Sequence, residues 1–444
     1  MPESAEEAGT GRGGGASPSA IRHGTRRGIT VQNRRRMTSD CRVAGSYPLT
    51  FQQYARLERA RQAAAHGATA RTNLMESACD VTGPLSLESV RSAALAVARR
   101  HPALRLSFED SVQVVAPCSA AEVPVADGTV ALSPVEDARL ALVISSDGAD
   151  RHRLTAQLDH LAFDGTSIEI FWRDFWAFYA SPPVSQQCAC NPTFLAFADA
   201  AAARSAQPAP GLDAAVAELR AADSPLGFAR FPVRLPLSEV GSRSAAAQVV
   251  DLGNTWWASY TAAARANGCT PFVAAAEAVL SAIGDLAPGS RPMMYTYLQN
   301  RRTPAEQEAI GWFAATVLLM APEVIDLRSV RAMVGAALSH GDVATELLHR
   351  RCGGGRRPAS LPSVSLALSQ APGSGTPLRV GELEIRRIAA ESVGSWLPRG
   401  RLAVDVAATG QLTIAYEVER YDPAIIRTFA DRIADGLLFA VDRC

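Results

Sequence analysis

One histidine in this chain has neighbours whose types and spacing suit proton transfer. His160 ends a run of alternating apolar and polar residues, and the pair Asp164 and Gly165 begins four residues later. Histidine is the side chain best suited to moving a proton near neutral pH. A turn at an Asp-Gly pair can hold the backbone that aims it. The spacing His-x-x-x-Asp-Gly therefore indicates chemistry at the end of a strand.

Two predicted elements position this histidine. Residues 153–158 alternate as a half-buried strand does, which puts His160 on the apolar face and Asp159 on the opposite one. After the turn, Thr166 and Glu169 have the spacing of a capping box, and apolar residues then repeat at helical spacing. A side chain at such a junction can face a cleft while its backbone stays rigid.

Composition is typical of a soluble globular enzyme. Of the 444 residues, 48% are hydrophobic and 20% are charged, and 44 basic residues balance 44 acidic ones. A neutral chain without a basic stripe is a poor candidate for nucleic-acid binding. The chain shows no apolar run near the ~20 residues of a membrane-spanning helix, and its N-terminus lacks the apolar core of a secretory signal. We therefore expect a cytoplasmic protein without nucleic-acid or membrane partners.

The eight cysteines do not indicate a metal site. Only Cys188 and Cys190 are close together, and no matching cysteine or histidine pair stands nearby. The glycine run 353–355 has no strand before it and no Walker lysine after it, so we interpret it as a loop. We expect neither a metal nor a bound nucleotide cofactor.

Composition also divides the chain into three parts. Residues 1–45 are rich in Gly, Ser and Arg and cannot bury a core, so we predict a disordered N-terminal extension, with Met37 as a candidate true start. Residues 46–205 and 206–444 each mix predicted strands with predicted helices, and the second part opens with an irregular crossover. Two halves of this kind predict an α+β fold with mixed sheets and a central cleft.

The periodic segments give a specific set of elements. Helices are predicted at 51–65, 87–100, from 168 onward, 256–267, 271–283, 329–348 and 423–441. Strands are predicted at 73–81, 138–145, 153–160, 292–299, 364–368, 383–388, 402–407 and 412–417.

Further segments carry a family likeness when they are taken in chain order with 160–165. They are 47–53, 83–85 with 100–108, 300–316, and the weaker pair 339–343 and 366–370. Together they resemble the condensation domains of nonribosomal peptide synthetases, which belong to the chloramphenicol-acetyltransferase-like superfamily. The likeness extends over 47–442. Two positions depart from it, because the family usually has a first histidine at Asp159 and an asparagine at Ala315.

The resemblance implies a fold and a reaction. The fold would be two chloramphenicol-acetyltransferase-like subdomains, 46–205 and 206–444, in a V-shaped pseudo-dimer with a central tunnel. The reaction would be acyl transfer from a thioester on the phosphopantetheine of an acyl or peptidyl carrier protein. The acceptor would be a small amine or alcohol, and the product an amide or ester in nonribosomal peptide or antibiotic biosynthesis. We expect a free-standing, monomeric condensation enzyme that needs no bound cofactor.

The resemblance also assigns residues. His160 would be the catalytic residue, either as a general base or as a group that positions the acceptor. The family's motif aspartate points away from the tunnel and pairs with an arginine, so Asp164 and Arg301 would support the site, and Gly165 would permit a close backbone approach. Three further residues are candidates for the acceptor side or the tunnel lining: Asp159, Trp312 and Trp396.

Three alternatives stay open. An acyltransferase of the same fold could use a coenzyme A thioester, and the same histidine could serve cleavage or cyclisation of an ester or amide. An inactive condensation-like module could instead recruit a partner protein. Asp159 and Ala315 keep this last alternative open, whereas the presence of His160, Asp164 and Gly165 argues against it.

Overall fold

The computed structural model describes the greater part of the chain. The ranges described are 43–65, 74–109, 111–127, 138–182, 190–205, 232, 234, 244–289, 291–339, 364–369, 377–388 and 402–442. The chain divides into two units, Met1–Thr38 and Ser39–Cys444, and every described residue belongs to the second. The predicted extension up to residue 42, with Met37, and the tunnel candidate Trp396 therefore lie outside the described residues.

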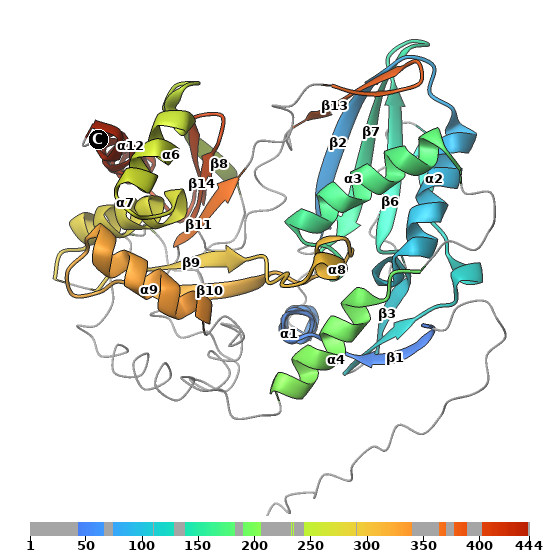
Figure 1. The fold of residues 1–444 in the computed structure, drawn as a ribbon, viewed down its shortest axis with the longest axis horizontal. Helices are drawn as coiled ribbons and strands as arrows, with labels where there is room; N and C mark the ends of the chain where they lie inside the picture. The colour runs from blue at the N-terminus through green and yellow to red at the C-terminus, as the bar shows by residue number, and fades with distance from the viewer. Residues whose placement is uncertain are drawn as a thin grey trace, which may run out of the picture. The chain divides into compact units, whose positions relative to one another are not determined.

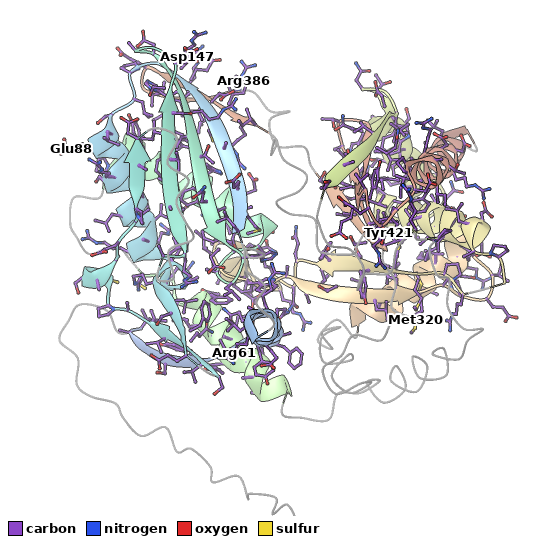
Figure 2. The ribbon with its side chains drawn as sticks, turned by 180° about the vertical axis from the view of Figure 1, so that it is seen from behind. Arg61, Glu88, Asp147, Met320, Arg386 and Tyr421 are labelled. Carbon is purple, nitrogen blue, oxygen red and sulfur yellow. The ribbon has the colours of Figure 1, made fainter. Side chains whose placement is uncertain are left out.

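The first six-stranded sheet carries the histidine motif. Its strand order is β12-β13-β2-β7-β6-β5, with the bounds β12 Leu378–Val380, β13 Leu383–Ile388, β2 Leu74–Thr82, β7 Arg151–Asp159, β6 Leu140–Ser146 and β5 Val125–Asp127. Helices α2 (Leu87–Arg100) and α3 (Gly165–Ala180) run along one face of the sheet (Figure 1). Buried side chains from both helices and from β2, β7 and β6 form one hydrophobic core. Figure 2 labels Asp147, which follows β6.

A small three-stranded sheet, in the order β1-β4-β3, adjoins this part of the chain. Its strands are β1 Gly45–Pro48, β4 Val112–Val115 and β3 Leu106–Glu109. Single 3-10 turns precede and follow the β3–β4 hairpin, at Pro102–Arg105 and Cys118–Ala120. Helices α1 (Phe51–Ala65) and α4 (Thr193–Ser205) lie close to this sheet in Figure 1.

The second six-stranded sheet has the order β10-β9-β11-β14-β15-β8. Its bounds are β10 Ala315–Met320, β9 Met293–Leu298, β11 Val364–Ser369, β14 Leu402–Ala407, β15 Gln411–Glu417 and β8 Ala245–Asp251. Strand β11 runs parallel to β9 and β14, and the other neighbours are antiparallel. A second core fills one side of this sheet, and Figure 2 labels Tyr421, which is fully buried within it.

Four helices pack into this second core. They are α6 Trp256–Ala266, α7 Pro271–Leu286, α9 Leu327–Ser339 and α12 Pro423–Asp442, while the short α8 (Pro304–Gln307) precedes β10. Helix α7 begins where the sequence predicts, since the Thr270 hydroxyl accepts from the Val273 amide and Pro271 occupies the first turn. Among the described helices, none alone has the length and apolar content to cross a membrane; α6 and α7 meet those criteria only as a pair bent by 94°.

The two halves of the sequence share the first sheet. Strands β12 and β13 belong to the second half, between β11 and β14, yet β13 pairs antiparallel with β2, from Glu384 opposite Thr82 to Ile388 opposite Ala78. The predicted elements are found with ends shifted by a few residues, except that 340–348 of the helix predicted at 329–348 lie outside the described residues. The mixed α+β fold class is confirmed. The boundary at residue 205 stays a prediction.

Candidate active site

His160 is the first residue after β7, in the loop that leads to α3. Its imidazole is half-buried, and the ring centroid of Trp312 lies 4.5 Å away with 46° between the planes. The guanidinium carbon of Arg56, from α1, lies 5.8 Å from the centroid of the Trp312 ring. A strand end, a helix and a segment far along the chain therefore meet at this histidine.

The surroundings keep His160 uncharged at neutral pH. Burial lowers the pKa of His160 to about 4, and the positive charge of Arg56 acts in the same direction. The backbone of His160 and Phe163 and the carboxylate of Asp164 oppose this shift. An imidazole that is neutral at pH 7 has a free lone pair, so it can accept a proton or a hydrogen bond from an attacking group.

Asp164 begins α3 as its N-cap. The Oδ1 atom of Asp164 accepts from the Ser167 amide at 2.8 Å, and the helix begins at Gly165. The predicted capping box of Thr166 and Glu169 is therefore wrong. Glu169 instead forms a two-pronged ion pair with Arg387 of β13, with both N···O distances at 3.2 Å, so its carboxylate is not turned back to the helix start.

The same aspartate joins the loop to the segment 301–314. Asp164 is 3% exposed and accepts from Arg301 Nη2 at 2.9 Å, so the ion pair that the resemblance implied is present. Its Oδ2 atom also accepts from the amides of Phe313 at 3.1 Å and Ala314 at 3.2 Å. The Arg301 side chain is fully buried, donates to the Ala309 carbonyl at 2.7 Å and lies 4.1 Å from the Phe313 ring. Neither partner has freedom to act as a base.

Ser167 and Gly311 complete this junction. The Ser167 hydroxyl lies 2.7 Å from Asp164 Oδ1 and 2.8 Å from the Gly311 carbonyl, and it accepts from Arg301 and from the Gly311 amide. A Cβ at position 311 would lie 2.1 Å from the Phe194 ring, so this position requires glycine. Ser167 is thus a structural hydroxyl and not a nucleophile.

Asp159 and Gly165 flank the loop in different settings. Asp159 forms an ion pair with Arg139, and its side chain is 16% exposed. Gly165 is the exposed first residue of α3, and a Cβ there would meet no atom within 4 Å. Among the residues that the structure describes, none would block a Cβ at this position, so they do not make the close approach that was expected.

Two residues of α1 were not identified from the sequence as parts of the site. The buried Gln53 donates through Nε2 to the Leu161 carbonyl at 2.9 Å and to Gln113 Oε1 at 3.1 Å, which fixes the residue after His160. Arg56, three positions along, supplies the charge near the ring. For Gln53, the available signal was a glutamine beside apolar residues in the segment 47–53. For Arg56, the sequence carried no signal.

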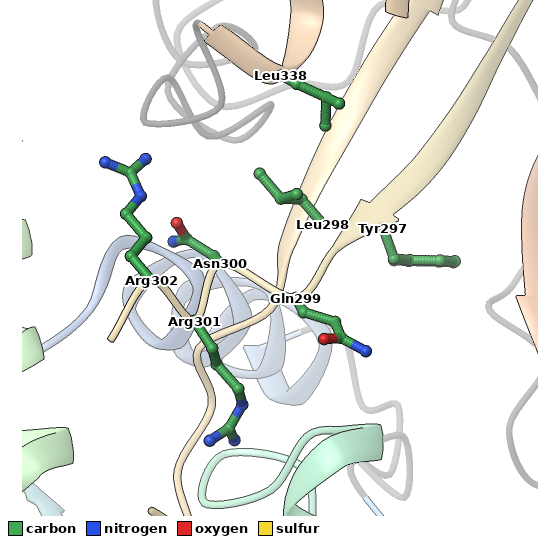
Figure 3. Close-up of a pocket in the computed structure, with 7 residues that line it drawn as sticks. All are labelled: Tyr297, Leu298, Gln299, Asn300, Arg301, Arg302 and Leu338. Atoms are coloured by element: carbon green, nitrogen blue, oxygen red, sulfur yellow. The ribbon is translucent and has the colours of Figure 1, made fainter. Parts of the chain in front are cut away.

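A pocket of about 660 Å³ lies against the segment 297–302, which carries Arg301. It is lined by Tyr297, Leu298, Gln299, Asn300, Arg301, Arg302 and Leu338. Figure 3 shows the Arg301 side chain directed away from those of Asn300 and Arg302. Asn300 has a φ of 54°, in the left-handed region that asparagine tolerates better than most residues. Because of this backbone turn, the side chains of Asn300 and Arg302 line the pocket while that of Arg301, between them, reaches Asp164.

Comparison with known proteins identifies the family. The family model for the condensation domain matches residues 43–444. The chain belongs to the condensation-domain family. Among curated proteins, a nonribosomal peptide synthetase TES from Alternaria alternata is 31% identical over 125 residues, which is 24% of this chain. That match covers only 2% of the synthetase, so the chain corresponds to a small part of such an enzyme.

Solved structures agree on the fold. The X-domain in its complex with OxyB from teicoplanin biosynthesis gives a TM-score of 0.71 at 15% identity, covering 89% of this chain and 93% of that one. The SgcC5 protein from Streptomyces globisporus, in complex with a naphthyl ethanediol and sucrose, gives 0.66 at 20% identity, covering 89% and 99%. The family is thus that of condensation domains, and the fold is the one that these solved structures share.

Proposed function

We propose that this protein transfers an acyl group from a carrier-protein phosphopantetheine thioester to a small amine or alcohol, in the manner of a condensation enzyme of specialised metabolism. The observation that carries the proposal is the neutral, half-buried imidazole of His160. It is packed against Trp312 at 4.5 Å and held on a loop that Asp164 fastens to Arg301. A protein that only recruits a partner has no need of such a histidine.

The chemistry requires one proton to move. The acceptor nitrogen or oxygen attacks the thioester carbonyl, the new C–N or C–O bond forms, and the C–S bond breaks to release the phosphopantetheine thiol. His160 would lie within about 3 Å of the acceptor and take its proton, or orient it by a hydrogen bond, which is typically worth roughly 100- to 10,000-fold in rate. Holding both substrates in reacting geometry would supply much of the remainder.

Two features bear on the substrates. The pocket beside Asn300 joins the apolar side chains of Tyr297 and Leu338 to the exposed guanidinium-bearing Arg302, a combination that suits the dimethyl and phosphate groups of a phosphopantetheine arm. The bound diol of the SgcC5 structure is an alcohol on the same fold, which supports offering alcohols as well as amines. We therefore keep both acceptor classes in the proposal.

The decisive experiment is a turnover assay read by mass spectrometry. Acyl thioesters on a separate carrier protein and on coenzyme A are each offered mixed amines and alcohols, with wild type compared with His160→Ala. The control is His152→Ala, since His152 lies on the same strand and its Nδ1 atom lies 2.8 Å from the hydroxyl of the exposed Ser146. Product that falls at least about tenfold in His160→Ala alone supports the proposal. Product that survives the change removes His160 from the mechanism.

The donor that gives product separates the carrier-dependent enzyme from a coenzyme A acyltransferase. A partner-recruiting module is the second candidate, because the X-domain structure holds a second protein, OxyB, on this fold. No product with any donor, together with binding of the carrier to wild type and to His160→Ala alike, favours that module.

A further inference from the structure

Asp159 departs from the family pattern directly before the proposed catalytic histidine, and its surroundings show what it does. The Asp159 carboxylate forms an ion pair through Oδ2 with Arg139 Nη1. The two side chains are 16% and 8% exposed, so the charges are largely withdrawn from water. An ion pair that is largely withdrawn from water holds its geometry more firmly than a pair on the surface does.

The register of the sheet fixes this pair. Leu140, the first residue of β6, lies opposite Leu158 of β7, so Arg139 lies opposite Asp159 at the next position. The backbone continues the ladder, because the Asp159 amide donates to the Arg139 carbonyl at 3.0 Å. Opposite charges that face each other across neighbouring strands stabilise the pairing. The end of β7 is thereby held to the start of β6.

Arg139 is itself anchored. Its Nε atom donates to the Leu106 carbonyl at 2.9 Å, and its guanidinium carbon lies 5.1 Å from the centroid of the Phe108 ring. Both of these residues belong to β3, in the neighbouring small sheet. These two contacts hold the Arg139 guanidinium in place beside Asp159. Forming the ion pair therefore costs little side-chain entropy.

The second carboxylate oxygen reaches past the histidine. Asp159 Oδ1 accepts from the Leu161 amide at 2.9 Å, while the Leu161 carbonyl accepts from Gln53 at 2.9 Å. The residues on both sides of His160 are therefore held through the Asp159 carboxylate. One oxygen pairs with Arg139, and the other accepts from the Leu161 amide. The backbone of His160 is left with little freedom to turn.

We propose that the Arg139–Asp159 ion pair is a positioning device for His160, which sets the direction of the imidazole by clamping the backbone on both sides of it. The inference rests on the proposed function. Asp159 acts through the backbone and not through its charge, since the charges that act most strongly on the His160 ring are those of Arg56 and Asp164. The role that we assign to Asp159 is therefore to aim the imidazole of His160.

Four variants test the proposal. Asp159→Asn keeps an acceptor for the Leu161 amide but removes the ion pair, Arg139→Gln removes the cation, and the double variant removes both. Asp80→Asn is the matched control, because Asp80 forms an ion pair with Arg153 in the same sheet at 2.9 Å with about half of each side chain exposed. Melting temperature is measured for all four, and rates are taken per folded molecule.

The first readout needs no activity. The ring carbon and proton resonances of His160 in protein labelled at histidine, assigned by their loss in His160→Gln, report the environment of the imidazole. We expect them to shift in Asp159→Asn and Arg139→Gln and to stay in place in Asp80→Asn. Unchanged His160 resonances in Asp159→Asn would overturn the proposal, whether or not the wild type turns over any substrate.

The second readout is kinetic. We expect kcat to fall at least about tenfold in each single variant with KM within about twofold, because a displaced catalytic group affects the reacting geometry more than substrate affinity. The double variant should lose little more than either single one, since the two residues act as a unit. A kcat that stays at the wild-type value while only the melting temperature falls would assign the pair to stability and overturn the proposal.

Discussion

Two carboxylates flank the proposed catalytic histidine, and they are held in opposite ways. Asp159 pairs with Arg139, 20 residues earlier, in the neighbouring strand of the same sheet. Asp164 pairs with Arg301, 137 residues later, and also accepts from the amides of Phe313 and Ala314. The first pair keeps its side chains 8% and 16% exposed, whereas the second is buried to 0% and 3%.

The difference separates two tasks. The local pair sets the end of β7, and through it the backbone of His160. The long-range pair fastens the following loop to the segment that carries Trp312, whose ring packs on the imidazole. The direction of the imidazole thus depends on the Arg139–Asp159 contact near the strand ends, whereas its enclosure depends on contacts between distant parts of the chain.

The largest effect is expected on the long-range side. Asp164→Ala leaves the buried Arg301 cation without its partner, so we expect a loss of ~3–5 kcal/mol in the free energy of unfolding and less soluble protein. Asp80→Ala, which removes a half-exposed pair with Arg153, should cost at most about 1 kcal/mol. Chemical unfolding monitored by fluorescence measures both. An Asp164→Ala protein with normal stability and no activity would contradict the structural role and return Asp164 to the chemistry.

Packing at Gly311 gives an intermediate effect on the same side. Gly311→Ala would bring a Cβ to 2.1 Å from the Phe194 ring, and overpacking of this kind costs roughly 1–3 kcal/mol. The control is Gly165→Ala, whose Cβ would meet no described atom within 4 Å, and it should melt as the wild type does. The pair Gly311→Ala with Phe194→Leu should recover part of the loss. Equal melting temperatures for the two alanine variants would show that segment 309–314 does not depend on this contact.

The smallest effect concerns charge and not structure. Arg56→Gln removes the cation near the ring, so the pKa of His160 should rise from about 4 towards its ordinary value, by less than about one pH unit. A histidine with a lowered pKa stabilises the folded state fully above pH ~6.5, and this contribution is lost as the pH falls through about 4. The variant should therefore lose less stability between these values. NMR titration measures the pKa, and Arg56→Lys, which keeps the charge, should leave it in place; a pKa that Arg56→Gln does not move would remove Arg56 from this account.

The sequence predicted the elements better than their junctions. Periodicity was enough for β7, α3 and most other elements, because burying an apolar face decides where they form. The cap of α3 was wrong because Glu169 is taken by Arg387, 218 positions away, and no local pattern reports such a partner. Arg139 escaped notice for a similar reason: it meets Asp159 only through the register of β6 against β7.

The site residues divide in the same way. The resemblance indicated Arg301 as the partner of Asp164, a contact beyond the reach of spacing alone. Gln53 lies within the segment 47–53, which carries part of the family likeness, but its hydrogen bond to the Leu161 carbonyl depends on where α1 packs. Trp312 was expected along the tunnel, and its contact with the His160 ring adds a role in enclosing the imidazole. Tertiary placement, and not composition, decides these contacts.

The pairing of β13 with β2 has a consequence for synthesis. Ser77 of β2 is hydrogen-bonded to Arg387 of β13 at 3.0 Å, although 310 positions separate them. On the ribosome, β2 emerges long before β13, so one of its edges has no strand to pair with until β13 is made, and Asp164 has no partner until Arg301 is made. Unpaired edges invite association with other chains, and contacts of such sequence separation form slowly. The nascent chain therefore passes through a prolonged interval of exposure to aggregation, and the surroundings of His160 are completed only once the segment 301–314 has been made.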